Sequence, residues 1–491
     1  MSNLAVMPII IPLFAGILVA FFHKKLSLAR ALSKLFILFN LVVVVYIAYT
    51  VFVSGNIILE TGSWEAPYGI IFVADPLSIL LVLTTNILSV ACLFIAPKLV
   101  SEEKEGFYFY TFVFLLISGV SGAFLTGDLF NLFVFFEVLL MASYGLIVLG
   151  GNKTQLRESL KYVLINLFSS IIFVTTVAFL YAVVGTVNMA HIAERVHEVK
   201  QQGILTTIAI VLFFVFATKA ALFPLYYWMP KSYIVPNPVV SALFGALLTK
   251  VGIYSIIRIY TLIFDINVDI TKNFFLIIAG LSMLFGVIGA LSTSNIKLLI
   301  AYNVIPSIGF ILLGLAVFNQ SGLSGSVYYL IHDMIIKAAL FLIVGVIAYA
   351  AGTSDLRKMG GLIHEYPKLG WILFIAAFVL AGIPPFSGFI GKLLLLQGAF
   401  QSDQIIIVIV GLITSLLILY SVMKIFINGF WGEKKEDFHK KRLNGLLSPI
   451  VFLLFFSVFL GIGAEFVYPY IETTAAYLLD PEIYINSVLK E

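Results

Sequence analysis

The sequence predicts an all-α polytopic membrane protein with about 14 transmembrane helices, and three observations support this fold class. Of the 491 residues, 61% are hydrophobic and only 11% are charged, whereas a soluble domain carries about 25% charged residues. Apolar runs of roughly 20 residues, the length that crosses a bilayer, recur along the whole chain. Most Lys and Arg residues lie between these runs. The composition excludes a soluble enzyme, a disordered protein and a nucleic-acid binder, and the runs are too long for the strands of an outer-membrane barrel.

The apolar runs define the predicted spans. The first is interpreted as a retained span, because neither a basic leader nor a cleavage site typical of a signal peptide accompanies it. No soluble domain separates the spans, and an even number of them places both termini on the same side. The fourteen spans are 4–22, 31–53, 77–96, 107–126, 129–150, 160–185, 204–230, 239–261, 274–292, 297–317, 326–351, 370–395, 404–428 and 447–469.

The positive charges predict the orientation of the chain. Of the 29 Lys and Arg residues, 19 lie on the side that includes the segment after the first span. Because positive charge marks cytoplasmic loops, we expect a multi-pass protein of the bacterial plasma membrane with both termini outside the cytoplasm. The net charge of +4 therefore reports orientation and does not indicate a nucleic-acid partner. The opposite side carries five: Arg195, Lys200, Arg258, Lys272 and Lys490.

Five further lysines lie inside the predicted spans. Lys424 is close enough to the end of its span to extend towards the lipid headgroups. An ion deep in the membrane costs on the order of 3 kcal/mol by insertion scales, so deep charges are candidate functional residues. The deep ionisable residues are Lys219, Lys250, Lys337 and Lys392, with Glu137, His332 and Asp333.

The seventh span, 204–230, is expected to be a broken helix. Pro224 cannot donate a hydrogen bond to the carbonyl of Ala220 and crowds it. The break therefore leaves a free carbonyl beside Lys219, which only protein or trapped water can satisfy inside a membrane.

The twelfth span, 370–395, shows the same feature. Pro384 and Pro385 stand in its middle and are expected to free the carbonyls of Leu380 and Ala381, with Lys392 close behind.

The two breaks occupy matching places in two blocks of five helices. Each lies in the fourth helix of its block, and five is odd, so the second block would enter the membrane from the opposite side. Interrupted helices at matching positions are typical of inverted-repeat transporters, although proline also produces simple kinks. We expect N-terminal helices in 1–106, a first repeat in 107–261, a second repeat in 262–428, and the last span with a C-terminal tail in 429–491.

The deep charges are interpreted as a path for protons. Glu137 would be held ionised by a lysine partner, for which we choose Lys219; a purely structural ion pair is the alternative. A buried lysine whose partner comes and goes can switch between its charged and neutral forms, as a proton relay needs. Lys219, Lys250 and Lys392 each stand alone in their spans, and each could instead anchor a loop carbonyl or stabilise a kink.

The eleventh span carries three of these groups. Asp333 and Lys337 are four residues apart, so they can pair on one helix face and could be partly structural. His332 titrates near neutral pH and is a candidate relay, although a lone buried histidine can simply be a satisfied core residue.

Other polar residues are given structural roles or none. Asp75, before Pro76, and Asp128 are interpreted as helix N-caps. The chain has six His and one Cys, Cys92, and no Walker A or HExxH motif. We therefore expect no metal site, no cofactor and no covalently catalytic residue.

Several motifs together resemble one family, the antiporter-like membrane subunits shared by respiratory complex I and Mrp-type Na⁺/H⁺ antiporters. The resemblance covers the third to the thirteenth span. The motifs are Lys219-Ala-Ala-Leu-Phe-Pro224-Leu-Tyr-Tyr-Trp228-Met-Pro230, Pro236-Asn-Pro238, Lys250-Val-Gly, Ile296-Lys-Leu-Leu-Ile-Ala-Tyr302, His332-x4-Lys337-Ala-Ala-Leu-Phe and Gly382-Ile-Pro-Pro-Phe-Ser-Gly-Phe-Ile-Gly-Lys392.

The resemblance implies fourteen helices and a proton path that uses Glu137, Lys219, Lys250, His332 and Lys392. The length of the chain and the lysine in the twelfth span are most similar to the D-type subunits of the Mrp antiporter. This implies other subunits of the same complex (types A, B, C, E, F and G) as partners, together with membrane lipid, protons and Na⁺. Outward Na⁺ movement would be coupled elsewhere in the complex.

Two other functions stay open. The same buried residues would serve a proton-pumping subunit of M or N type in a redox-driven complex, which neighbouring genes or co-purifying flavin and iron–sulfur subunits would reveal. A passive scaffold is the third possibility, and it predicts that Lys250→Ala leaves transport intact.

Overall fold

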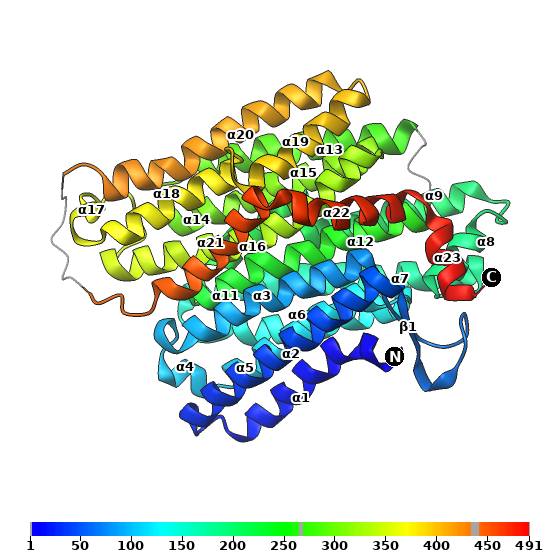
Figure 1. Cartoon of the computed structure of the whole chain (residues 1–491), viewed down its shortest axis with the longest axis horizontal. Coiled ribbons are helices and arrows are strands. Elements are labelled where there is room, and N and C mark those ends of the chain that lie inside the picture. Colours follow the sequence, from blue (N-terminus) through cyan, green and yellow to red (C-terminus); the bar gives the residue numbers. More distant parts are fainter. Residues whose placement is uncertain (1, 265–268, 434–440, 491) are drawn as a thin grey trace.

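The structure is a computed structural model that describes residues 2–264, 269–433 and 441–490. It is built almost entirely of helices that lie side by side along its longest axis (Figure 1), as the sequence predicts for a polytopic membrane protein. The N-terminal part consists of η1 (Ser2–Val6), α1 (Met7–Phe21), α2 (Leu26–Ser54), β1 (Ile57–Glu60), η2 (Thr61–Ser63), β2 (Ile71–Ala74), α3 (Pro76–Leu99), α4 (Glu102–Gly106), α5 (Phe109–Leu125), α6 (Leu129–Val148), α7 (Lys153–Val184) and α8 (Met189–Val196).

The rest of the chain continues in the same way, with two interrupted helices. These elements are α9 (Gln202–Ala220), η3 (Leu225–Trp228), α10 (Met229–Ile234), α11 (Pro238–Leu243), η4 (Phe244–Leu248), α12 (Thr249–Leu262), α13 (Asp269–Ser292), α14 (Ile296–Tyr302), α15 (Val304–Val317), α16 (Gln320–Ala351), α17 (Leu362–Glu365), α18 (Pro367–Ala381), α19 (Ser387–Gln401), α20 (Ile405–Ile425), η5 (Phe426–Phe430), α21 (Leu447–Ile462), α22 (Ala464–Leu479) and α23 (Pro481–Leu489).

Every predicted span contains a helix. Among the described residues, eleven helices are long and apolar enough to cross a membrane, or twelve if the bent pair α21 and α22 forms one span. The shorter apolar helices α5 and α18 fall on two of the remaining predicted spans. Both termini lie near the same end of the helices (Figure 1), which agrees with an even number of crossings. The number fourteen itself stays a prediction.

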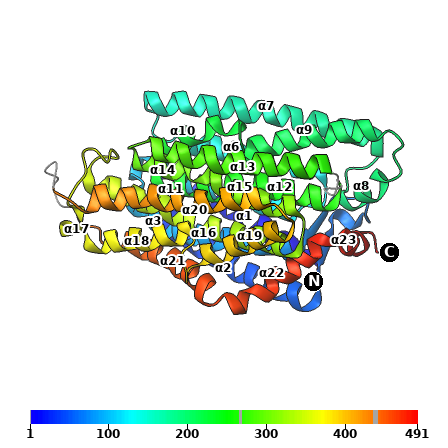
Figure 2. The same ribbon diagram turned by 90° about the horizontal axis from the view of Figure 1, so that it is seen from above.

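The most buried helices form the centre of the molecule. All of the apolar window of α11–α12 is buried, whereas only 33% of that of α20 is. α16 packs against α3, α15, α19, α21 and α22. Figure 2 shows α7 and α9 along one edge and α21 and α22 along the opposite edge. The deep charges of α12 and α16 thus lie on helices that other helices cover on most sides.

Two helix starts are confirmed. Asp75 caps α3 in a capping box, accepting a hydrogen bond from the Ser78 amide at 2.8 Å, and Asp128 caps α6 through the Asn131 amide at 2.7 Å. Ahead of α3, the segment expected to be a loop forms an antiparallel hairpin in which β1 pairs with β2, from Ile57 opposite Ala74 to Glu60 opposite Ile71.

The last predicted span differs from the expectation. Instead of running straight over 447–469, it bends by 80° between α21 and α22. Gly461 and Gly463 lie at the bend. Glycine has no Cβ, so it allows the backbone to turn sharply and neighbouring segments to approach closely. Beyond the bend, α22 buries Ile471, Ala475 and Leu478 and packs on α16, so the expected C-terminal tail is largely helical.

Candidate functional site

Three ionisable side chains meet in the centre of the molecule, on α12 and α16. The Lys250 Nζ lies 2.7 Å from Asp333 Oδ2, and the Lys337 Nζ lies 3.4 Å from Asp333 Oδ1. All three side chains are completely buried. The predicted Asp333–Lys337 pair is confirmed. Lys250, on another helix, also contacts Asp333, so two lysines share one carboxylate.

Irregular backbone holds both lysines in place. Lys250 follows the π-helical turn η4 and donates to the Gly245 carbonyl at 2.8 Å. Lys337 donates at 2.8 Å to the carbonyl of Asn303, the residue between α14 and α15. Such interruptions leave carbonyls outside the regular helical ladder and are common at functional sites. Each lysine therefore has one neutral and one charged acceptor.

His332 lies beside this cluster and contacts the second broken helix. Its Nδ1 is 2.8 Å from the Oγ of Ser387, the first residue of α19. Its Nε2 is buried and, within the described part of the chain, has no hydrogen-bond partner. The ring therefore joins α16 to the break and keeps one nitrogen available for a proton.

The second break forms as predicted. α18 ends at Ala381 and α19 begins after Pro384 and Pro385. The Lys392 Nζ donates to Ala381 O at 2.7 Å and to Leu380 O at 3.3 Å. These are the two carbonyls that the prolines were expected to free, so the lysine satisfies the broken helix end.

The first break also forms as predicted, but the predicted ion pair beside it does not. α9 ends at Ala220, before Pro224. The Lys219 Nζ donates to Ser170 Oγ at 3.1 Å and lies 4.9 Å from the ring centre of Phe136. Within the described residues, no ion pair within 4.0 Å joins it to Glu137, whose Oε1 is buried without a hydrogen-bond partner. The ring that Lys219 faces belongs to Phe136, the residue before Glu137.

Backbone packing brings Lys219 near the central cluster. A Cβ on Gly252 would overlap the backbone of Lys219 and Ala220, so α9 and α12 touch two residues away from Lys250. No direct contact joins the two lysines among the described residues. The structure thus brings together Lys250, Asp333 and Lys337, sets His332 and Lys392 at the second break, and leaves Glu137 and Lys219 as a separate group.

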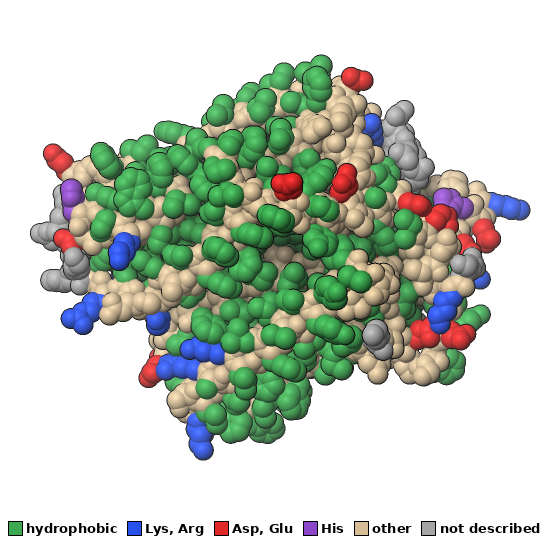
Figure 3. Space-filling model, viewed as in Figure 1, with side chains coloured by type: hydrophobic (Ala, Val, Ile, Leu, Met, Phe, Trp, Pro, Cys, Tyr) green, Lys and Arg blue, Asp and Glu red, His purple; other side chains and the backbone are tan. Residues whose placement is uncertain are grey.

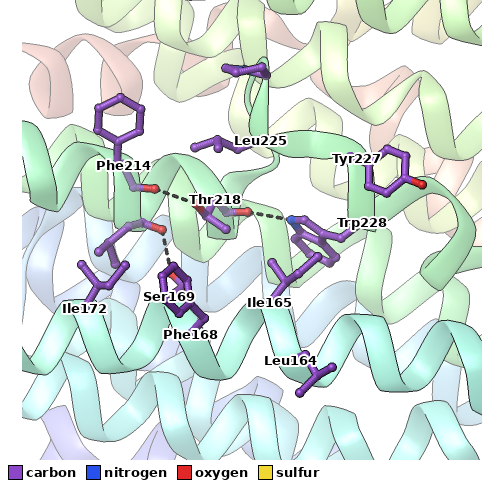
Figure 4. A pocket seen from close by; sticks show the side chains of 12 residues that line it. Leu164, Ile165, Phe168, Ser169, Ile172, Phe214, Thr218, Leu225, Tyr227 and Trp228 are labelled. Atoms are coloured by element: carbon purple, nitrogen blue, oxygen red, sulfur yellow. Dashed lines mark hydrogen bonds between the residues drawn. The ribbon is translucent and has the colours of Figure 1, made fainter.

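An apolar groove of about 560 Å³ opens beside the first break, between α7 and α9 (Figure 4). Its lining includes Ile165, Phe168 and Trp228, and the Trp228 indole donates to Thr218 O at 3.1 Å. The hydroxyls of Ser169 and Thr218 also bond to backbone carbonyls. The groove therefore suits apolar groups, and Tyr227 adds an exposed phenol to its lining.

A buried ion pair that the sequence did not reveal lies near the end of α12. The Arg258 Nη2 is 2.5 Å from Asp75 Oδ2, and both side chains are almost completely buried. Arg258 also contacts the Tyr254 hydroxyl at 3.3 Å and the ring of Tyr484 at 5.2 Å. Counting Arg258 among the exposed charges of one side was therefore wrong. Its position inside the predicted span 239–261, on the same helix as Lys250, was the available signal.

We expect Asp75→Asn to destabilise the protein, because asparagine can still cap α3 but leaves the buried guanidinium unpaired. Breaking a buried ion pair from one side costs about 3–5 kcal/mol. Thermal unfolding of the detergent-solubilised protein measures the effect. Asp128→Asn is the matched control, since Asp128 is also a buried cap but makes no ion pair among the described residues. An equal loss in both variants would contradict the role given to Arg258.

Among the described residues, no three His, Cys, Asp or Glu side chains gather as metal ligands would.

The chain matches the transmembrane family described as NADH:quinone oxidoreductase/Mrp antiporter over residues 126–418. This region holds all the deep charges named above.

Relatives match over the whole chain. The D subunit of the Na⁺/H⁺ antiporter of Alkalihalophilus pseudofirmus is 49% identical and that of Bacillus subtilis is 48% identical, each over 100% of both chains. In the solved structure of the Mrp complex from Dietzia sp. DQ12-45-1b, one chain is 31% identical with a TM-score of 0.91, covering 99% of both chains. The chain therefore belongs to the NADH:quinone oxidoreductase/Mrp antiporter transmembrane family.

Proposed function

We propose that this chain is the D-type membrane subunit of a multisubunit Na⁺/H⁺ antiporter and that it moves protons along its buried ionisable side chains. Full-length similarity to the D subunits of two Na⁺/H⁺ antiporters supports the first statement. The partners are the A, B, C, E, F and G types of subunit, and the chain acts as a transporter subunit without enzymatic chemistry of its own.

The observation that carries the proton path is the carboxylate of Asp333 between two lysines. It lies 2.7 Å from the Lys250 Nζ and 3.4 Å from the Lys337 Nζ. One carboxylate balances one ammonium group, so the site favours a single extra proton shared between the two lysines. Moving this proton from one lysine to the other, through trapped water, needs only small side-chain shifts.

Glu137 and Lys219 form the uptake end of the path. Lys219 bonds to the neutral hydroxyl of Ser170, and the buried Glu137 Oε1 has no hydrogen-bond partner among the described residues, so a proton can be exchanged between them without first breaking a tight ion pair. The close approach of α9 to α12 at Gly252 brings this group next to Lys250.

His332 and Lys392 form the release end. The free Nε2 of His332 can accept a proton from the central cluster, while Ser387 holds the ring through Nδ1. Lys392 donates to two carbonyls at the end of α18, and these carbonyls stabilise its ammonium form without a counter-charge. The lysine can thus gain or lose a proton without leaving an unpaired carboxylate.

The chain spans the bacterial plasma membrane with both termini outside the cytoplasm. The excess of Lys and Arg in alternate connecting segments supports this orientation. On the face seen in Figure 3, basic side chains lie at both ends of the molecule, and at the end of α8 and the C-terminus they are mixed with acidic ones.

The test is Na⁺-driven proton movement in vesicles that hold the whole complex. We expect Lys219→Ala and Glu137→Ala each to lower the Na⁺-induced pH change by about 100-fold, the effect of losing a positioned proton donor or acceptor. Thr175→Ala, an exposed hydroxyl on α7 that bonds only to its own helix, is the control and should keep full activity. Full antiport in either charge variant would overturn the proton path, and a complex whose proton movement needs the reduction of a quinone would overturn the antiporter assignment.

A further inference from the structure

The bend between α21 and α22 rests on the second broken helix. A Cβ on Gly461 would overlap the backbone of Pro385 and Phe386, so the two backbones touch there. The hydroxyl of Tyr328, on α16, donates to the carbonyl of Leu460 next to this contact. Since α18 and α19 have 15 residues each, their break lies halfway along the span. The bend is therefore also near the middle of the membrane.

The two prolines of the second break lie at the surface at this depth. Pro384 and Pro385 are exposed, and so is Ile462 at 69%. Two consecutive prolines carry no N–H groups, and the helical ladder is interrupted on either side of them. Irregular backbone inside a membrane is found where protein or a water-filled cavity covers it, and not against lipid.

A carboxylate is exposed on the same face. Glu465 is the second residue of α22, just beyond the bend, and Glu472 follows two helical turns later; both are exposed. Their neighbours Phe466 and Tyr470 are 75% and 47% exposed. Figure 3 shows two acidic groups over α22 surrounded by apolar side chains.

Neither carboxylate is neutralised within the chain. Among the described residues, no Lys, Arg or His nitrogen lies within 4.0 Å of Glu465 or Glu472. Gln320 donates only to the backbone carbonyl of Glu472, at 2.9 Å. Charged side chains inside a membrane pair with one another or face protein or water. Glu465 lies in the first turn of α22, where the helix dipole favours a carboxylate, and a cation on a neighbouring chain would complete its neutralisation.

We propose that the face around Glu465, bounded by Pro384, Pro385, Ile462, Phe466 and Tyr470, binds a transmembrane helix of another subunit, and that this helix presents a Lys or Arg side chain to Glu465. The apolar side chains pack against the helix, and the cation neutralises the carboxylate in a medium where an unpaired ion is costly. The inference rests on the proposed function only in taking the partner to be a subunit of the same antiporter complex.

The experiment places a photo-crosslinking amino acid at Phe466 in the complete complex in native membranes. We expect a covalent product with one other subunit, and the cross-linked peptide should be a membrane helix with Lys or Arg within one turn of the link. The same variant expressed without the other subunits should give no such product. A product with lipid alone in the complete complex, or with a helix that lacks a basic residue, would overturn the proposal.

Charge variants test the pairing itself. We expect Glu465→Lys to lower the yield of intact complex on native gels by about tenfold, because it sets like charges against each other, and Glu465→Gln to lower it less. Glu482→Lys, at an exposed carboxylate of α23, is the matched control and should change nothing. Reversing the partner's cation should restore the Glu465→Lys complex; failure to restore it, with the chain still present in the membrane, would contradict the pairing.

The test of this interface can fail or succeed independently of the test of the proposed function. Cross-linking reads out the contact, whereas Na⁺-driven pH change reads out transport. A complex that cross-links at Phe466 but does not exchange Na⁺ for H⁺ would overturn the function and keep the interface, and the reverse result would do the opposite.

Discussion

Replacing Lys250 with methionine should lower Na⁺-driven proton movement by about 100-fold while the chain still folds and assembles, as expected when one positioned proton carrier is lost. The fold should survive because Asp333 keeps Lys337 as a partner at 3.4 Å and methionine fills a similar volume. Vesicles that hold the whole complex provide the transport measurement, and native gels provide the yield of complex.

Lys424→Met is the control for removing a lysine from a span. Lys424 donates to the carbonyls of Leu291 and Thr293 at the end of α13, which agrees with the expected position at the end of its span. This variant should keep its transport activity. If Lys250→Met also kept full activity, the chain would be a passive scaffold, and the central lysine would be structural.

Replacing Asp333 with asparagine should have the largest effect on stability. The substitution leaves the positive charge shared by two buried lysines without a carboxylate, and removing one partner of a buried ion pair costs about 3–5 kcal/mol. We expect a lower unfolding temperature of the detergent-solubilised protein and a lower yield of complex, together with loss of transport.

A second substitution separates stability from transport. Adding Lys337→Met to Asp333→Asn removes one of the two buried lysines left without the carboxylate, so the double variant should recover part of the lost stability. Transport should stay lost, because the shared carboxylate is still missing. If Lys337→Met did not restore stability, the three side chains would not form one electrostatic unit, and the energies of the two substitutions would simply add.

The sequence was sufficient for the features that follow from local chemistry. Apolar runs of spanning length predicted all eleven of the candidate membrane helices found among the described residues, since the bilayer requires about 20 apolar residues whatever the neighbours are. The prolines predicted both breaks, and for the second they predicted the two carbonyls that Lys392 satisfies. Asp333 and Lys337, four residues apart, were paired correctly because helix geometry alone places them together.

Contacts between helices could not be predicted from a single sequence. Lys250 was given no partner on another span, Glu137 was expected to pair with Lys219, and Arg258 was counted among the positive charges of one side. In each case the partner lies on a distant segment, and periodicity within one helix does not show which face meets which neighbour. The bend at Gly461 was also missed, because the apolar composition continues through it.

The sequence by itself therefore determined that this is a polytopic membrane protein with two broken helices and a set of deep charges. Only the tertiary structure decided how those charges are grouped: Asp333 between Lys250 and Lys337, Asp75 with Arg258, and Glu137 apart from Lys219. The physical reason is that hydropathy and proline act within one segment, whereas the pairing of buried charges depends on how segments far apart in the chain pack in three dimensions.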